Sequence, residues 1–102
     1  MKKLLFLILF SLFTFLLSAQ PTIQWQKAIG GGDFDEANKI RITSDGGYVV
    51  AGTTFSNDYD VQGSHGLADF WIVKLTISGA VQWTKTLGGS DYDRATDIQQ
   101  TN

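Results

Sequence analysis

After residue 19 the chain alternates apolar and polar side chains with a period of two, which is typical of half-buried β-strands. No segment shows the period of about 3.6 residues that marks a long helix, although residues 35–38 fit a single helical turn. Turn sequences with glycine, which allows positive φ, lie at 44–47 and 78–79. The pattern predicts an all-β protein with these strands: 23–29, 39–43, 48–54, 70–76 and 81–87.

The strand predicted at 70–76 is apolar on both sides. Trp71, Val73 and Leu75 point to one side of it, and Phe70 and Ile72 point to the other. A sheet with two apolar faces has to be covered on both of them.

Residues 24–44 recur 58 positions later as residues 82–102, and ten of the 21 positions are identical. A fixed period of this size indicates a repeat architecture. One full repeat, 25–82, is followed by part of a second, 83–102. Because four consecutive antiparallel strands make a propeller blade, we predict one full four-stranded blade plus part of a second, an incomplete propeller. The stop within a repeat favours a fragment of a longer chain over assembly of separate copies.

The first 19 residues have the layout of a secretory signal peptide. Lys2 and Lys3 precede an apolar run at 4–17, and Ser18 and Ala19 supply small residues for cleavage. The run is short for a bilayer span, which needs about 20 apolar residues. A cleaved signal peptide is therefore favoured over an uncleaved anchor, and we expect residues 20–102 to be secreted or displayed at the cell surface.

Loss of the signal peptide's two lysines changes the formal net charge from −2 to −4. The charges are not clustered, which argues against a nucleic-acid partner because phosphate binding needs a basic patch. The chain contains no cysteine. Packing, a metal ion or neighbouring units must then supply the stability that small exported domains often take from disulfides.

Three strings of this sequence resemble one known family. W-x-K-x-x-G-G begins at residue 25, D-G-G-Y-V-V-A-G-T-T at residue 45 and D-F-W-I-V-K-L at residue 69. They are similar to the bacterial β-propeller repeat of exported proteins, in the version common in secreted Bacteroidetes proteins that use type IX secretion. The resemblance covers nearly all of 23–102 and implies an extracellular or surface location and several blades, without implying an enzymatic activity. Family members carry many more repeats than this chain.

The stretch between the strands predicted at 48–54 and 70–76 contains candidate calcium ligands. Asp58, Asp60, Gln62 and Asp69 occupy positions 1, 3, 5 and 12 of a calcium-loop template. Such a loop delivers the hard oxygen ligands that calcium prefers. Gln62 is neutral and Asp69 is shorter than the usual glutamate, so a solvated surface loop is the competing and favoured interpretation.

Two acidic pairs, Asp33/Asp35 and Asp91/Asp93, recur one period apart. Repetition favours a structural role, in which the carboxylates bond backbone N–H groups of the adjacent Gly-Gly turn, over a metal site or an acid–base pair. His65 is the single histidine, and the sequence suggests no orienting residue that would complete a catalytic triad.

The sequence therefore predicts a non-catalytic structural or binding segment of a secreted or cell-surface β-propeller protein. Trp25 and Trp83, one period apart, are interpreted as blade-packing residues rather than a sugar-stacking platform. The expected partners are further blades of the same or a longer chain, with a carbohydrate or a protein as candidate ligand. The alternative is part of a propeller-type carbohydrate-active enzyme, a hydrolase or lyase, whose catalytic residues lie elsewhere. A short self-associating β protein is a third class.

Overall fold

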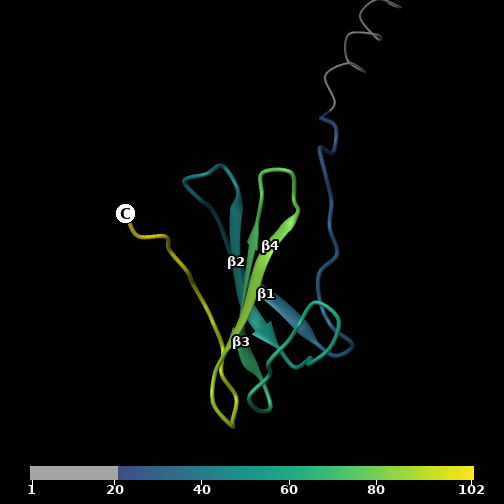
Figure 1. Ribbon diagram of the computed structural model, residues 1–102, viewed down its shortest axis with the longest axis vertical. Coiled ribbons are helices and arrows are strands. Elements are labelled where there is room, and N and C mark those ends of the chain that lie inside the picture. The colour runs from purple at the N-terminus through teal and green to yellow at the C-terminus, as the bar shows by residue number, and fades with distance from the viewer. Residues whose placement is uncertain (1–20) are drawn as a thin grey trace, which may run out of the picture.

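The computed structural model describes residues 21–102, which contain one four-stranded antiparallel sheet (Figure 1). The strands are β1 (Asp35–Ile42), β2 (Tyr48–Thr54), β3 (Asp69–Leu75) and β4 (Val81–Leu87), and each strand pairs with the next one in the chain. The predicted all-β fold with a four-stranded antiparallel sheet is confirmed. The signal peptide predicted at 1–19 lies outside the described residues. Residues 21–102 contain no helix that is long and apolar enough to cross a membrane.

The hairpins β1–β2 and β3–β4 use the predicted glycine turns. Gly46 and Gly79 have φ angles of 81° and 86°, which residues with a side chain rarely adopt. Their N–H groups donate to the carbonyl oxygens of Thr43 and Thr76, each at 3.0 Å. Both hairpins therefore form where the sequence predicted them.

β1 begins at Asp35, earlier than predicted, so the helical turn expected at 35–38 is wrong. The register between β1 and β2 shifts just after Ala37, where a bulge interrupts the alternation of side chains. Gly52 lies opposite Ala37, and a side chain there would overlap the carbonyl oxygen of Glu36. The missing side chain lets the two backbones approach, and the ladder continues through the bulge to the start of β1.

Two rows of side chains define the faces of the sheet. One row across the four strands is Ile40, Val50, Val73 and Thr84, and the next is Arg41, Val49, Lys74 and Trp83. Adjacent rows point to opposite sides, so we call the side of the first row face A and the side of the second row face B. The main cluster of buried apolar side chains lies on face A and consists of Val61, Trp71, Val73 and Leu75. On face B, Val49 and Ala51 are also buried.

The segment 23–29, predicted as a strand, joins no ladder, so that prediction is wrong. It crosses face A in an extended form. Trp25 packs edge-on against Tyr48, with ring centroids 5.6 Å apart, and lies directly against Gly79. Ile29 packs against the core. The repeat counterpart of this segment, residues 81–87, forms β4 because it lies beside β3. Residues 23–29 have no strand beside them to pair with within residues 21–102.

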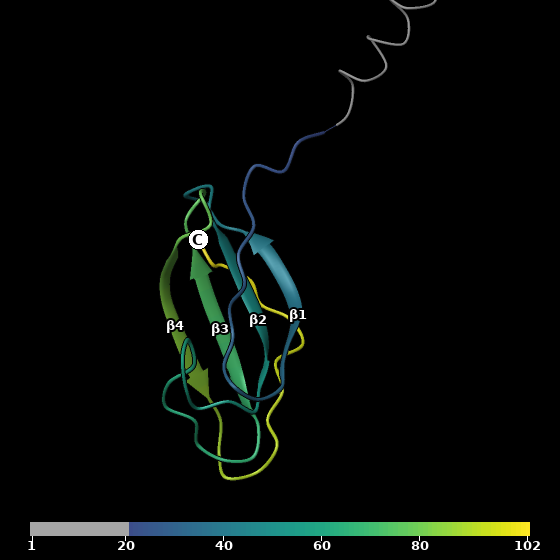
Figure 2. The same cartoon turned by 90° about the vertical axis from the view of Figure 1, so that its right-hand side faces the viewer.

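The chain after β4 returns across face B. Asn38 Nδ2 donates to the carbonyl oxygen of Ala95 at 2.9 Å, and the N–H of Ser44 donates to Gln100 Oε1 at 2.8 Å. Figure 1 shows the sheet between the N-terminal segment (blue) and the C-terminal segment (yellow). Figure 2 looks onto the sheet, with the N-terminal segment in front of it and the C-terminal segment behind it. Each face of the sheet is therefore crossed by one extended segment.

Candidate functional site

A groove of about 390 Å³ lies between the 23–29 segment and face A. Its walls are mainly apolar and include Trp25, Ile40, Val50 and Val73. Ile40 remains 57% exposed. A single extended segment thus covers face A only in part, and the remainder is an apolar surface open to another element.

Face B has a second groove, of about 340 Å³, between the sheet and residues 98–100. Trp83, Val49 and Lys74 line it. Trp83 was interpreted as a packing residue, yet it is 49% exposed here and belongs to the wall of the groove rather than to the core. Its repeat counterpart Trp25 does contact the core cluster, so the two tryptophans have different surroundings.

The repeated Gly-Gly-x-Asp-x-Asp sequence builds the same turn twice. The N–H of Gly31 donates to Asp35 Oδ2, and the N–H of Gly89 donates to Asp93 Oδ2, both at 2.7 Å. The aspartate two positions earlier in each copy accepts from the backbone N–H that follows it. The prediction that these recurring carboxylates bond local backbone N–H groups is confirmed, which identifies them as a structural feature copied with the repeat.

Two of the four candidate calcium ligands come together at the first of these turns. Asp58 accepts from the N–H of Gly32 at 2.6 Å, and Asp60 accepts from the N–H of Gly30 at 3.1 Å. Both bonds join the β2–β3 loop to residues that lie about 30 positions earlier in the chain. The two carboxylates are therefore already used as acceptors for backbone N–H groups.

The other two candidates lie apart from this turn: Gln62 is in the β2–β3 loop, and Asp69 is the first residue of β3. Gln62 donates to a backbone carbonyl of its own loop at 3.3 Å. Asp69 is fully buried, accepts from the N–H of His65, and places Oδ2 3.2 Å from His65 Nδ1. Asp69 Oδ1 is buried without a hydrogen-bond partner among the described residues. No three His, Cys, Asp or Glu side chains within 21–102 are grouped so as to hold a metal ion, and calcium binding stays a prediction from the sequence.

The pairing of His65 with Asp69 was not expected from the sequence. A carboxylate beside a histidine nitrogen is an arrangement that can support a general base. The neighbouring hydroxyl of Ser64 lies 3.5 Å from the carbonyl oxygen of Gly66, and the hydroxyl of Thr86 donates to two loop carbonyls at 2.8 Å each. Both hydroxyl groups are engaged with the backbone. The contact between His65 and Asp69 joins the β2–β3 loop to the first residue of β3.

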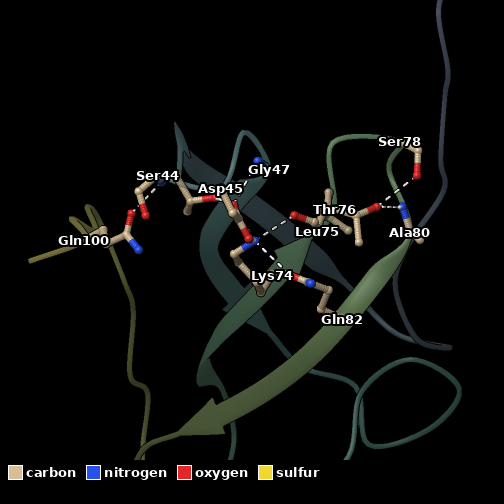
Figure 3. Close-up of polar contacts among 11 residues, drawn as sticks. Ser44, Asp45, Gly47, Lys74, Leu75, Thr76, Ser78, Ala80, Gln82 and Gln100 are labelled. Atoms are coloured by element: carbon tan, nitrogen blue, oxygen red, sulfur yellow. Dashed lines mark hydrogen bonds and ion pairs between the residues drawn. The ribbon is translucent and has the colours of Figure 1, made fainter.

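At the other end of β3, Lys74 is the centre of a polar cluster (Figure 3). Its side chain is 10% exposed, and Nζ donates to Asp45 Oδ2 at 3.1 Å, to Gln82 Oε1 at 2.8 Å and to the carbonyl oxygen of Leu75 at 3.0 Å. The hydroxyl of Thr43, the backbone N–H of the turn and then Lys74 hold the pKa of Asp45 well below its usual range. The one signal in the sequence was a lysine within an otherwise apolar strand.

Comparison of the chain with family models, with curated proteins and with solved structures finds no match. The functional argument therefore depends on the two faces of the sheet and on the segments that cross them.

Proposed function

We propose that this chain is a non-catalytic structural and binding segment of a β-propeller protein that is exported and then secreted or held at the cell surface. Residues 25–82 make one blade and residues 83–102 begin the next. Further blades of the same or a longer chain are its partners.

One observation carries this proposal. Two segments whose sequences repeat those of the edge strands β4 and β1 cover opposite faces of the sheet. Residues 24–29 match 82–87, within β4, and lie on face A. Residues 93–100 match 35–42, which is β1, and lie on face B. In a propeller, blades pack face to face around the axis, so a strand from the blade before and one from the blade after are expected on opposite faces.

Exposed apolar side chains on both faces support the same proposal. Ile40 and Ile42 are exposed on face A, and Trp83 is half-exposed on face B. Burial of apolar surface contributes roughly 25 cal/mol per Å², and a repeat unit that cannot bury its faces alone gains this from neighbours. A blade on each side would cover all three residues.

Adding one repeat to the chain tests the proposal. A copy of residues 45–102 placed directly after Asn102 continues the pattern in phase, because Asn102 corresponds to Ser44. We expect residues 93–100 to become the first strand of a second sheet, with backbone amide exchange slowed by about 100-fold or more. The first sheet should also gain stability, since neighbouring repeats stabilise one another through their interface.

The matched control places the same copy after a long Gly/Ser linker inserted behind Asn102, which breaks the phase of the repeat. The propeller proposal is rejected if exchange in residues 93–100 is equally fast in the in-phase and linker chains, or if the two units unfold independently.

A further inference from the structure

The C-terminal segment follows β1 in the same direction and nearly in register. Arg94 lies 3.5 Å from Glu36, and Asp97 lies 3.1 Å from Arg41. The carbonyl oxygen of Ile98 accepts from Arg41 Nε at 2.6 Å. The partners in these contacts are 56 to 58 positions apart. The second copy of the β1 sequence is thus laid along the first.

The two copies carry opposite charges where they meet. By the 58-residue period Glu36 corresponds to Arg94, and Lys39 corresponds to Asp97. Glu36 and Arg94 form an ion pair with each other. Asp97 pairs with Arg41, which shares face B with Lys39. The hydrogen bond from Arg41 lowers the pKa of Asp97, and the charge of Lys39 contributes to the same shift.

From this juxtaposition we infer that β1 is a charge-selective docking strand. Its partner is the β1-type strand of the neighbouring repeat, with a base at the Glu36 position and an acid at the Lys39 position. The inference rests on the proposed function and adds a rule for which repeat can follow which. If the neighbouring repeat had the same charges as β1, its glutamate would face Glu36, and its lysine would lie near Lys39 and Arg41. Like charges across an interface select against a partner.

The exposure of these side chains indicates selection rather than stabilisation. The side chains of the two ion pairs are 41% to 61% exposed. Exposed ion pairs contribute little to stability because solvent and salt screen them. Charges at the rim of an interface nevertheless discriminate between partners and fix their register.

Charge reversal in the full chain tests the pairing. Glu36→Arg and Arg94→Glu should each lower the ratio of docked to free residues 94–100 by about two- to fivefold at low salt, measured from the NMR chemical shifts of this segment. The double variant Glu36→Arg/Arg94→Glu should restore the wild-type ratio of docked to free segment to within about twofold, because the pair is re-formed with its charges exchanged. Lys85→Glu, at an exposed site on β4, controls for the change in net charge in Arg94→Glu. If the ratio in the double variant is lowered by the product of the two single effects, the inference is wrong.

The chain with the appended copy of residues 45–102 separates this inference from the proposed function. In that chain the last segment is the appended copy of residues 93–102, and it should lie along residues 94–100. The two segments have the same sequence, so an arginine faces Arg94 and an aspartate faces Asp97. Changing Arg94→Glu and Asp97→Lys in the appended copy only should raise the ratio of docked to free last segment by about fivefold, measured from its NMR chemical shifts. An unchanged ratio for the last segment, with the amides of residues 93–100 protected from exchange, would overturn charge selection and leave the propeller proposal standing. Unprotected residues 93–100 would count against the propeller proposal instead.

Discussion

A single buried lysine joins three parts of the chain at one end of the sheet. Lys74 in β3 donates to Asp45 in the β1–β2 turn and to Gln82 in β4. A buried cation is costly unless it is paired and hydrogen-bonded. Its acceptors fulfil both conditions, so the cluster orients the two hairpins relative to each other.

Asp45 makes the stability of the chain depend on pH. Its pKa is lowered on folding, first by the hydroxyl of Thr43, then by the backbone N–H of Gly47 and by Lys74. A carboxyl whose pKa falls on folding contributes stability that is fully present above its unfolded pKa, about 3.9, and is lost as the pH falls through the folded value. We expect Asp45→Asn to destabilise the chain near neutral pH, and the difference from wild type to shrink as the pH falls from about 4 towards about 2. Urea unfolding across this range measures it.

Thr43→Val serves as the second variant for this prediction. Removal of the hydroxyl takes away the largest cause of the shift, so the carboxyl of Asp45 should titrate at higher pH by NMR. A titration of Asp45 that is the same in both proteins, or a pH-independent effect of Asp45→Asn, would contradict this account.

At the scale of elements, two segments of nearly the same sequence adopt different states. Residues 82–87 form part of β4, whereas 24–29 cross face A without joining a ladder. Both carry tryptophan and lysine at matching positions, and two glycines follow each of them. The difference is the presence of an adjacent strand, because a β-ladder forms only where a neighbouring strand supplies partners for the backbone N–H and C=O groups.

The two tryptophans report on this difference. Trp25 packs against Tyr48 and the core, so Trp25→Ala should lower the free energy of unfolding by about 2 kcal/mol, below the cost for a fully buried tryptophan. Trp83 is half-exposed, and Trp83→Ala should cost less than about 1 kcal/mol. Chemical unfolding followed by far-UV circular dichroism compares the two. In the chain with one added repeat, the cost of Trp83→Ala should rise to at least that of Trp25→Ala, and an unchanged small cost there would show that face B stays open.

At the scale of the whole molecule, the sheet has two apolar faces and one extended segment for each. The central strands β2 and β3 pair on both sides, while β1 and β4 are edges of the sheet. Edge strands of this kind pair readily with other chains unless they are covered. Stacked repeats would cover the faces, which is the physical argument behind the propeller proposal.

The β2–β3 loop also acts on the whole molecule, because Asp58 and Asp60 fasten it to the Gly30–Gly32 turn. If the predicted calcium loop is real, the ion at about 100 times its Kd should stabilise the fold by about 2.7 kcal/mol. For a domain of this size that corresponds to a rise in Tm on the order of 10 °C. Melting in calcium is compared with melting in magnesium, and Asp58→Asn/Asp60→Asn is the control because asparagine keeps the acceptor oxygens. An identical Tm in both ions removes the calcium hypothesis.

Much of the fold could be read from local pattern. The alternation and the glycine turns located β2 and β4 at the observed residues and β3 within one residue. The recurrence of Asp35 as Asp93 indicated a copied turn, and the bonds to Gly31 and Gly89 confirm it. The start of β1 was missed because a bulge breaks the alternation there.

What the sequence determined by itself is the set of interactions that act over a few residues: strand preference, turn glycines, and carboxylates that bond an N–H four positions away. The tertiary structure alone decided which copy of the repeat became a strand, where Lys74 and Asp69 found their partners, and which charges face one another along β1. Most of these outcomes depend on residues from 8 to 58 positions apart. Periodicity along the chain shows that a segment can pair, but only the arrangement in space shows whether a partner lies beside it.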